Sequence, residues 1–378
     1  MKQKRVTSYD VARVAGVSQS AVSRVFRPGF SVSKKTREKV IATANEMGYR
    51  PNAIARMLIT KQSGMVAVIL SSQANLNYPE VLSELNRELA LNNKRVLLFT
   101  LDNADELDEL LENIWTFQVD GVIALAAHFD SKSLSLFAKH STPIVLYNRN
   151  VPESNANTVC CNHDKGIKQL IDLLHQANHK SYLIIAGPTD SDVANERREI
   201  AENYLHTLGV QNTPVIYGDY GYKSARDALK KWLKKHPKPD AIICSNDAMA
   251  IGVIDELKEN FYINVPDDMS VVGFDGISAS SWYNYQITTI QQPMKQLTKA
   301  AVDILIERIE NPQAAAEARV FTGSLIEGTL LKHVKLRNFC GQKSCLYFTW
   351  HFMQSPNVCS ANYRAAKCRL HTLCYSIY

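Results

Sequence analysis

The first 58 residues contain the pattern that most restricts how this chain can fold. Two short amphipathic segments are joined by a glycine in the run from Thr7 to Phe26, TSYDVARVAGVSQSAVSRVF. Thr7 followed by Asp10 predicts a helix start, because a hydroxyl can accept from the free backbone N–H groups and a carboxylate suits that end of the helix dipole. Gly16 can adopt a positive φ at no steric cost, so a sharp turn is predicted there.

The two segments are predicted to be helices that pack against each other. Val11, Val14 and Ala15 fall on one face of the first helix, and the small side chain of Ala12 allows a close approach. Ser18 is a second candidate N-cap. The buried side of the second helix is predicted to consist of Ala21, Val22, Val25 and Phe26. This arrangement is a helix-turn-helix, and it leaves four polar residues facing outward: Gln19, Ser20, Ser23 and Arg24.

Those outward side chains suit the edges of DNA bases. Arg can bind guanine with two hydrogen bonds in the major groove, Gln can bind adenine, and Ser suits base or phosphate. The alternative is a small helical hairpin with an ordinary polar face. Net charge argues against it, because residues 1–61 hold 13 Lys and Arg against 3 Asp and Glu, a net +10. A basic lobe of this kind is the electrostatic footprint expected for binding phosphates.

A third helix and a separate short segment follow. Ser33 is predicted to cap a helix with Val40, Ile41, Ala44 and Met47 inward, and Gly48 is predicted to end it; residues 1–50 would then form a three-helix head. Residues 51–63 hold a short helical pattern followed by a polar linker. An isolated helix of that length is marginal in water, so a plain linker is the alternative.

Three segments of this region resemble one protein family. The runs 6–25, 32–40 and 48–56 closely resemble the lactose-repressor/galactose-repressor family of bacterial transcription regulators, and the similarity continues to about Glu327. The resemblance implies a sequence-specific DNA-binding repressor, a homodimer on a near-palindromic double-stranded operator. It also implies that 51–59 is a hinge helix that orders on DNA, with Leu58 as an apolar wedge in the minor groove. The implied DNA-binding residues are Thr7, Tyr9, Ser18, Gln19, Ser20, Ser23, Arg24, Ser33, Thr36, Asn52, Ala55 and Leu58.

From Met65 onward the chain alternates between short apolar runs and amphipathic helical patterns. The alternation predicts an α/β fold with doubly wound parallel sheets. Eight units in about 265 residues are better divided between two domains than built into one sheet. The predicted strands are 66–70, 96–99, 121–125, 144–147, 182–186, 215–217, 241–244 and 271–274.

The resemblance implies how these units are grouped. It implies a periplasmic-binding-protein-like core of two subdomains with a ligand cleft between them. The first subdomain would contain residues 64–161 with 293–320, and the second 162–292 with 321–331. The chain would cross between them near 161–164, 290–293 and 320–323.

Polar residues follow several predicted strands, where ligands bind in open parallel sheets. Carboxylates and amides can bind pairs of hydroxyls, Arg donates a planar fork, and aromatic faces pack on C–H patches, so this mixture suits a sugar-like effector. One departure from the family is Asn162-His163, where relatives often have Asp-Asn. Trp282 and His128 are further candidates. The effector-binding residues implied at matching positions are Tyr78, Asn148, Arg197, Tyr220, Asn246 and Asp275.

Each of these residues also has a structural interpretation. Asp275 and Asn246 could cap the next helix or shape a turn, the commoner role for an isolated Asx residue. Arg197 could be a surface charge paired with Glu199 or Glu202, and Tyr220 could be a packing aromatic.

Charge and composition limit the other function classes. Residues 62–331 carry a net −11, so contact with DNA is assigned to the head. No stretch has the apolar length of a secretion signal or a membrane helix, and a cytoplasmic protein is expected. Of the 8 cysteines, Cys160, Cys161 and Cys244 lie in apolar runs and are interpreted as small buried hydrophobes.

No catalytic motif stands out, and neither a cofactor nor a metal site is predicted. A plain sugar-binding receptor is the alternative function, but it would need an export signal and no DNA-binding head. A sugar kinase or hydrolase is a more distant alternative, which turnover of a sugar would support.

Residues 332–378 differ in character from the rest. They hold 7 Lys and Arg, no acidic residue and 5 of the 8 cysteines, with no sustained period of 2 or 3.6. The cysteine spacings lack the paired C-x-x-C of most zinc sites, and no leucine heptad is present. We interpret this tail as a shifted or extended reading frame outside the fold, with a metal-binding or DNA-contacting arm as the alternative. Truncation after Leu331 is expected to retain dimerisation and binding.

Overall fold

The computed structural model describes residues 6–26, 30–50, 62–71, 76–101, 104–125, 131–149 and 156–329. The predictions for the hinge helix with Asn52, Ala55 and Leu58, for His128, and for the 332–378 tail fall on residues outside these ranges.

The amino-terminal head consists of three helices, α1 (Ser8–Ala15), α2 (Gln19–Val25) and α3 (Lys34–Glu46). Thr7 caps α1 as predicted. Its hydroxyl oxygen accepts from the backbone amide of Asp10, and the Asp10 carboxylate accepts from the Thr7 amide at 3.0 Å. Gly16 ends α1 in the left-handed conformation, with φ of 59°, which confirms the predicted turn.

A small apolar core joins the three helices, but two predicted core positions are wrong. The exposed fractions of Val14 and Ile41 are 57% and 40%. Successive helical residues are about 100° apart, so the buried arc of α1 runs from Val11 through Ala15 to Ala12 and leaves Val14 beyond its edge. The buried residues of this core are Val11, Ala12, Ala15, Val22, Val25, Val40 and Ala44.

A six-stranded sheet forms one half of the body. Its order is β11-β5-β4-β3-β1-β2, and every adjacent pair is parallel, as the alternating pattern predicted. The strands are β1 (Met65–Ser71), β2 (Arg95–Leu101), β3 (Gly121–Ala124), β4 (Ile144–Tyr147), β5 (Asn157–Cys161) and β11 (Ala318–Phe321).

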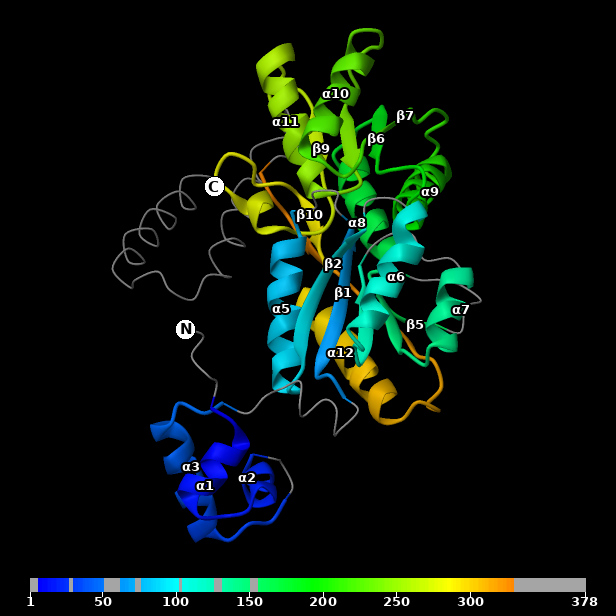
Figure 1. Cartoon of the computed structure of the whole chain (residues 1–378). Helices are drawn as coiled ribbons and strands as arrows, with labels where there is room; N and C mark the ends of the chain where they lie inside the picture. The colour runs from blue at the N-terminus through cyan, green and yellow to red at the C-terminus, as the bar shows by residue number, and fades with distance from the viewer. Residues whose placement is uncertain are drawn as a thin grey trace, which may run out of the picture. The chain divides into compact units, whose positions relative to one another are not determined.

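Helices cover both faces of this sheet (Figure 1). Successive side chains of β1 point to opposite faces, as the pleat of a strand requires. Val66 and Val68 pack with α5 and α12 on one face, while Ala67 and Ile69 pack with α6 and α7 on the other. The elements are α5 (Tyr78–Leu91), the 3-10 turn η1 (Ala104–Glu106), α6 (Leu107–Thr116), α7 (Ser131–Lys139) and α12 (Met294–Glu310).

A four-stranded parallel sheet, in the order β7-β6-β8-β9, forms the other half. Tyr182 and Ile184 pack with α8 and α9, whereas Leu183 and Ile185 pack with α10 and α11. The strands are β6 (Tyr182–Ala186), β7 (Val215–Tyr217), β8 (Ala241–Cys244) and β9 (Ser270–Val272). The helices are α8 (His163–Gln176), α9 (Asp192–Thr207), α10 (Tyr222–Leu233) and α11 (Asp247–Phe261).

Four strands were not among those predicted. They are β5 and β11 of the six-stranded sheet, and β10 (Thr289–Gln291) and β12 (Ser324–Ile326), which pair antiparallel. Each has only three to five residues and contains polar or small side chains, so none was selected as a strand, although β5 includes the apolar run with Cys160 and Cys161. β10 leads directly into α12, and a 3-10 turn, η2 (Ser278–Ser281), lies before it.

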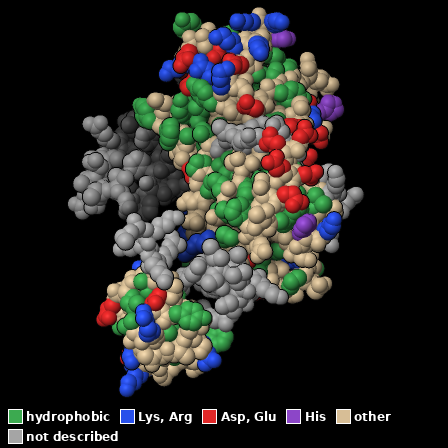
Figure 2. Space-filling model, in the orientation of Figure 1, with side chains coloured by type: hydrophobic (Ala, Val, Ile, Leu, Met, Phe, Trp, Pro, Cys, Tyr) green, Lys and Arg blue, Asp and Glu red, His purple; other side chains and the backbone are tan. Residues whose placement is uncertain are grey.

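The surface of the body is not uniformly acidic. Figure 2 shows Lys and Arg side chains gathered in the region of α10 and α11. Exposed lysines of α10 and of the segment after it include Lys231, Lys234, Lys235 and Lys238. The negative net charge of residues 62–331 therefore describes their sum and not every part of their surface. Among the described helices, none is both long enough and apolar enough to cross a membrane.

Candidate functional site

The outward face of α2 is available for contact with DNA. Ser20 and Arg24 are exposed, and Ser23 is half-buried. Gln19 is also half-buried, and its side-chain amide donates to the hydroxyl of Ser8 on α1 at 3.3 Å. Within the described ranges, Arg24 makes no ion pair, so its guanidinium is available for a base or phosphate.

Several predicted DNA-binding hydroxyls also act within the head itself. Thr7, Ser18 and Ser33 are the N-caps of α1, α2 and α3, and each side-chain oxygen accepts from a backbone N–H in the first turn. The hydroxyl of Thr36 lies 2.8 Å from that of Ser33. These oxygens satisfy helix-end donors that would otherwise be unpaired. Tyr9 is 72% exposed on α1.

The carboxyl ends of the strands border a cavity of about 110 Å³. This is where open parallel sheets place ligands. Residues that follow strands of both sheets contribute to it, together with residues of α5 and α9. The lining residues are Ser71, Asn77, Tyr78, Val81, Leu125, Tyr147, Asn148, Arg149, Pro188, Asp190, Ser191, Val193, Arg197, Tyr220, Asp275 and Gln292.

Arg197 and Asp275 form a buried ion pair in this lining. Arg197 Nη2 lies 3.1 Å from Asp275 Oδ1, and both side chains are about 95% buried. The guanidinium also donates to the carbonyl of Ser245 at 2.7 Å and lies over the ring of Phe274, 4.1 Å from its centroid. Gln292 donates to the same Asp275 oxygen at 2.6 Å. Arg197 is therefore not the surface charge paired with Glu199 or Glu202 that was the alternative.

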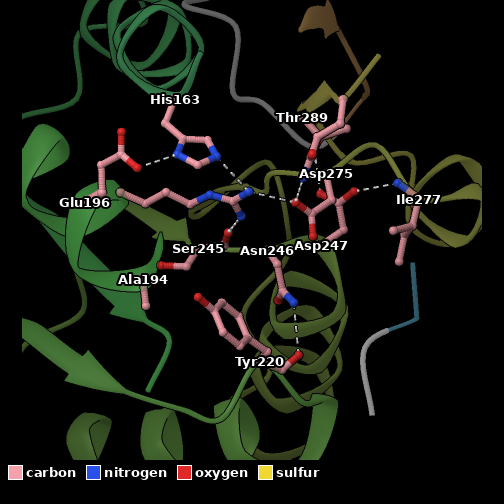
Figure 3. Close-up of polar contacts among 12 residues, drawn as sticks. His163, Ala194, Glu196, Tyr220, Ser245, Asn246, Asp247, Asp275, Ile277 and Thr289 are labelled. Carbon is pink, nitrogen blue, oxygen red and sulfur yellow. Dashed lines mark hydrogen bonds and ion pairs between the residues drawn. The ribbon is translucent and has the colours of Figure 1, made fainter. Parts of the chain in front are cut away.

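Asn246 does not belong to the cavity lining. Its Oδ1 caps α11 by accepting from the amide of Met249 at 2.9 Å, and its Nδ2 donates to the carbonyl of Tyr220 at 3.0 Å. Figure 3 shows the second contact and, beside it, the polar contacts of His163 and Asp247. The capping role considered for Asn246 is thus the one that the structure gives it, and its predicted effector contact stays a prediction.

A second ion pair lies at the edge of the cavity. Arg149 follows β4 and Asp192 begins α9, and their side chains approach to 3.1 Å. The Arg149 side chain is 5% exposed and that of Asp192 is 72% exposed. Burial lowers the pKa of Arg149, and the nearby Asp192 carboxylate works in the opposite direction. The cavity therefore contains two arginines, each facing a carboxylate.

Four buried polar atoms of lining residues have no hydrogen-bond partner among the described residues: Asn148 Oδ1, Arg149 Nη1, Arg149 Nη2 and Arg197 Nε. Of these, Arg149 Nη2 is the atom that lies 3.1 Å from the Asp192 carboxylate in the ion pair. Buried polar atoms in folded proteins are almost always paired. The hydroxyls of a ligand in the cavity are one kind of partner that these buried atoms could have.

Tyrosines supply the aromatic part of the site. Burial raises the pKa of Tyr78 to about 12 and also raises the pKa of Tyr220, so both rings are neutral. The Tyr220 hydroxyl lies 2.9 Å from that of Ser191, and Tyr220 itself has a positive φ of 67°. Tyr78 and Tyr220 come from opposite halves of the body, so a ligand between them would touch both.

The structure brings most of the predicted effector residues together. Tyr78, Asn148, Arg197, Tyr220 and Asp275 all line the cavity. Trp282 is 60% exposed and is not part of the lining.

Sequence reasoning missed Gln292 and did not select Arg149. Gln292 follows the unpredicted strand β10, and Arg149 is the second residue after a predicted strand, so position alone could have identified Arg149. Cys160, Cys161 and Cys244 are buried free thiols, as predicted.

The side chains that line the cavity are suited to binding a small molecule. The paired charges, amides and neutral tyrosines can orient hydroxyl groups, and the two ion pairs leave little net charge for an ionic ligand. In the described part of the chain, no group of three or more His, Cys, Asp or Glu side chains is placed to hold a metal ion.

Comparison with known proteins agrees with both halves of this description. Residues 7–52 match the family of bacterial regulatory proteins of the lacI family, and residues 171–329 match the periplasmic binding protein-like domain. Catabolite control protein A of Priestia megaterium is 31% identical over 306 residues, which cover 79% of this chain and 91% of that protein. The ribose operon repressor of Escherichia coli strain K12 is 29% identical over 326 residues, covering 85% and 98%.

A solved structure gives the same picture. The crystal structure of the lac repressor dimer bound to operator and the anti-inducer ONPF is 28% identical, with a TM-score of 0.79, over 87% of this chain and all of that chain. With an amino-terminal family match and a relative of 31% identity aligned over most of its length, this chain belongs to the lacI family of bacterial regulatory proteins, which are DNA-binding transcription regulators and not enzymes.

Proposed function

We propose that this protein is a homodimeric repressor whose operator affinity is set by a small, neutral, sugar-like molecule bound in the cavity. The operator is a near-palindrome, because a two-fold symmetric dimer presents two recognition helices about one helical turn apart. The protein acts in the cytoplasm, where its DNA is. The relatives support the dimer and the effector: one solved relative is a dimer bound to operator and an anti-inducer.

The observation that carries the proposal is that one chain contains both a DNA-binding head and a polar cavity. The head has an exposed recognition helix with an available guanidinium at Arg24. The body has a cavity in which Asn148 Oδ1, Arg149 Nη1 and Arg197 Nε are buried without hydrogen-bond partners among the described residues. A DNA-binding head alone would not need the cavity, and a sugar receptor would not need the head.

The mechanism is thermodynamic linkage. An effector can change DNA affinity only by its own difference in affinity between two conformations of the protein. The cavity provides that difference, because its lining comes from both halves of the body. Arg149 follows a strand of the six-stranded sheet, and Asp192 lies on a helix of the four-stranded one, so their 3.1 Å contact holds only when the two halves are near each other.

The test is selection of bound DNA from random sequence, followed by operator titration with a panel of sugars and sugar phosphates. We expect a near-palindromic site and a change in operator affinity with a neutral sugar. A DNA-binding protein that responds only to phosphorylated sugars would contradict the neutral class of effector. Turnover of any sugar by the purified protein would contradict the assignment as a regulator alone.

A further inference from the structure

The structure places the His163 side chain directly against Arg197. His163 is the first residue of α8 and is 2% exposed. Its ring meets the edge of Phe274, with 5.6 Å between centroids, and Arg197 lies over the same Phe274 ring. A Cβ at Gly166 would approach Phe274 to 3.0 Å, so the glycine allows α8 to pack this closely. The imidazole is therefore held behind the guanidinium that lines the cavity.

The two ring nitrogens face groups of opposite hydrogen-bonding character. Nδ1 lies 2.9 Å from Glu196 Oε2, and Nε2 lies 3.4 Å from Arg197 Nη2. An ionised carboxylate can only accept, and a guanidinium can only donate. One protonation state satisfies both: a neutral ring whose Nδ1–H donates to Glu196 and whose Nε2 accepts from Arg197.

We propose that His163 is a positioning residue of the cavity. Its neutral Nε2 accepts a hydrogen bond from Arg197 and so keeps the guanidinium directed toward Asp275 and the Ser245 carbonyl. Protonation of the ring removes this hydrogen bond and weakens small-molecule binding. The inference rests on the proposed function, because it concerns the same cavity. It adds a residue outside the lining, and it makes the effector response depend on pH.

The charges around the ring determine the direction of this effect. From α9 the ring faces Glu196 and Arg197, and Asp275, which follows β9, is the other charged group that acts on it. Burial lowers the pKa of His163 below 6.5, with Arg197 adding to the effect, while Glu196 and Asp275 act in the opposite direction.

Protonation would turn Nε2 from an acceptor into a donor and place a positive charge beside Arg197. The neutral arrangement is present above the lowered pKa of His163 and is lost as the pH falls through that pKa. Binding should weaken over the same interval.

The first experiment observes the ring itself. The full-length protein is labelled with nitrogen-15 histidine, and the His163 signals are assigned by their loss in His163→Asn. We expect a neutral ring protonated at Nδ1 near pH 7, with a pKa below 6.5. A ring protonated at Nε2, or one charged at pH 7, would overturn the proposal. This result does not depend on any effector.

The second experiment measures binding from pH 7 to pH 5. D-ribose, D-galactose, D-glucose and D-fructose are titrated calorimetrically into the full-length protein. For any sugar that binds, Kd should rise by up to about tenfold per pH unit below the His163 pKa, since one proton is linked to binding. His163→Asn should bind more weakly with a flat profile. Asp247 is the described carboxyl with a raised pKa, about 8, so it stays mostly protonated below pH 7.

Two further variants separate positioning from a general loss of structure. Glu196 has a side chain 47% exposed, so Glu196→Gln should fold. It removes a charge that favours the imidazolium, so the fall in affinity should move to lower pH. His175→Gln alters an exposed histidine on the same helix and should keep the wild-type profile. Identical profiles in wild type, His163→Asn and Glu196→Gln would overturn the proposal. If no sugar binds the wild type, the proposed function fails for this panel, and the ring measurement still decides the role of His163.

Discussion

The head and the cavity differ in how far their predicted binding residues are exposed to solvent. In the head, Ser20, Arg24 and Tyr9 are exposed, and Thr43 is the single buried polar side chain among the described head residues. In the body, the side chains around the cavity are buried and bound to one another, as in the pair of Arg197 with Asp275.

The contrast concerns how far function can be separated from stability. An exposed side chain gains its partners only on binding, so its removal should leave the fold intact. A buried charged side chain already has partners, and removing it leaves another charge uncompensated in a low-dielectric environment. Substitutions of exposed side chains in the head should therefore change binding alone, and substitutions of buried side chains at the cavity should change binding and stability together.

The largest effect is expected for Arg197→Ala. It should destabilise the body by about 3–5 kcal/mol, because the Asp275 carboxylate would remain buried without its cation. It should also remove the response to the effector. Urea unfolding followed by tryptophan fluorescence measures the first effect, because residues 1–61 contain no tryptophan. Effector titration of the operator complex measures the second.

Arg198→Ala is the matched control. Arg198 is the next residue on α9 and pairs with Glu199 and Glu202, whose side chains are 60% and 34% exposed. Surface pairs of this kind contribute about 0–1 kcal/mol, so the variant should stay near wild type in both measurements. Equal losses in Arg197→Ala and Arg198→Ala would break the distinction between buried and exposed sites.

Asp247 is expected to make the free energy of unfolding depend on pH, by about 2 kcal/mol between pH 6 and pH 8. This carboxyl is fully buried and accepts from the Ile277 amide at 2.9 Å and the Thr289 hydroxyl at 2.6 Å. Burial raises its pKa from 3.8 to about 8. Between these values the folded state binds a proton that the unfolded state does not, so stability falls as the pH rises from 6 to 8.

Asp247→Asn cannot ionise and should remove most of this pH dependence. Urea unfolding of both proteins at pH 6, 7 and 8 provides the comparison. Curves that fall equally with pH would mean that another group is responsible.

Arg24→Ala should weaken specific DNA binding by about 1–3 kcal/mol, and it should relax the base preference at one base pair in each half-site. Its thermal unfolding should be unchanged, because the side chain is exposed. Lys34→Ala should instead weaken binding equally on all sequences and reduce its salt dependence. Equal loss on operator and random DNA for Arg24→Ala would contradict the base-reading role.

The same contrast explains what the sequence could predict. Helix starts and stops in the head depend on local signals, such as Thr7 with Asp10 and the left-handed Gly16, so they were found. The parallel sheets follow from alternation over long stretches. The strands β5, β10, β11 and β12 were missed because their pairing is decided by distant segments and their own sequences are short and partly polar.

The cavity was predictable by topology but not by contact. Parallel strands bring their carboxyl ends together, which predicts the convergence of Asn148, Tyr220 and Asp275. Whether an Asn at such an end faces the cavity or caps the following helix depends on how that helix is rotated, and Asn246 shows the capping outcome. Gln292 was missed because its strand was missed.

The smallest expected effect is at Ser33, a head residue whose side chain, like those of the cavity, is already bound within the fold. Its hydroxyl caps α3 by accepting from the Thr36 amide at 3.2 Å, and Ser33 is also a predicted DNA contact. Ser33→Ala should destabilise the head by about 1 kcal/mol through loss of the cap. Amide hydrogen exchange within α3 of the full-length protein measures this loss.

Ser33→Asp separates the two roles of this hydroxyl. Asp caps helices as well as Ser does, so exchange in α3 should match wild type. The new negative charge would repel phosphate, so DNA binding should weaken on operator and random sequence alike, most at low salt. Unchanged DNA binding in Ser33→Asp would assign this residue to the cap alone. Binding to DNA would then depend on the exposed face of α2, and the head would still contain polar side chains that, like those of the cavity, are already bound within the fold.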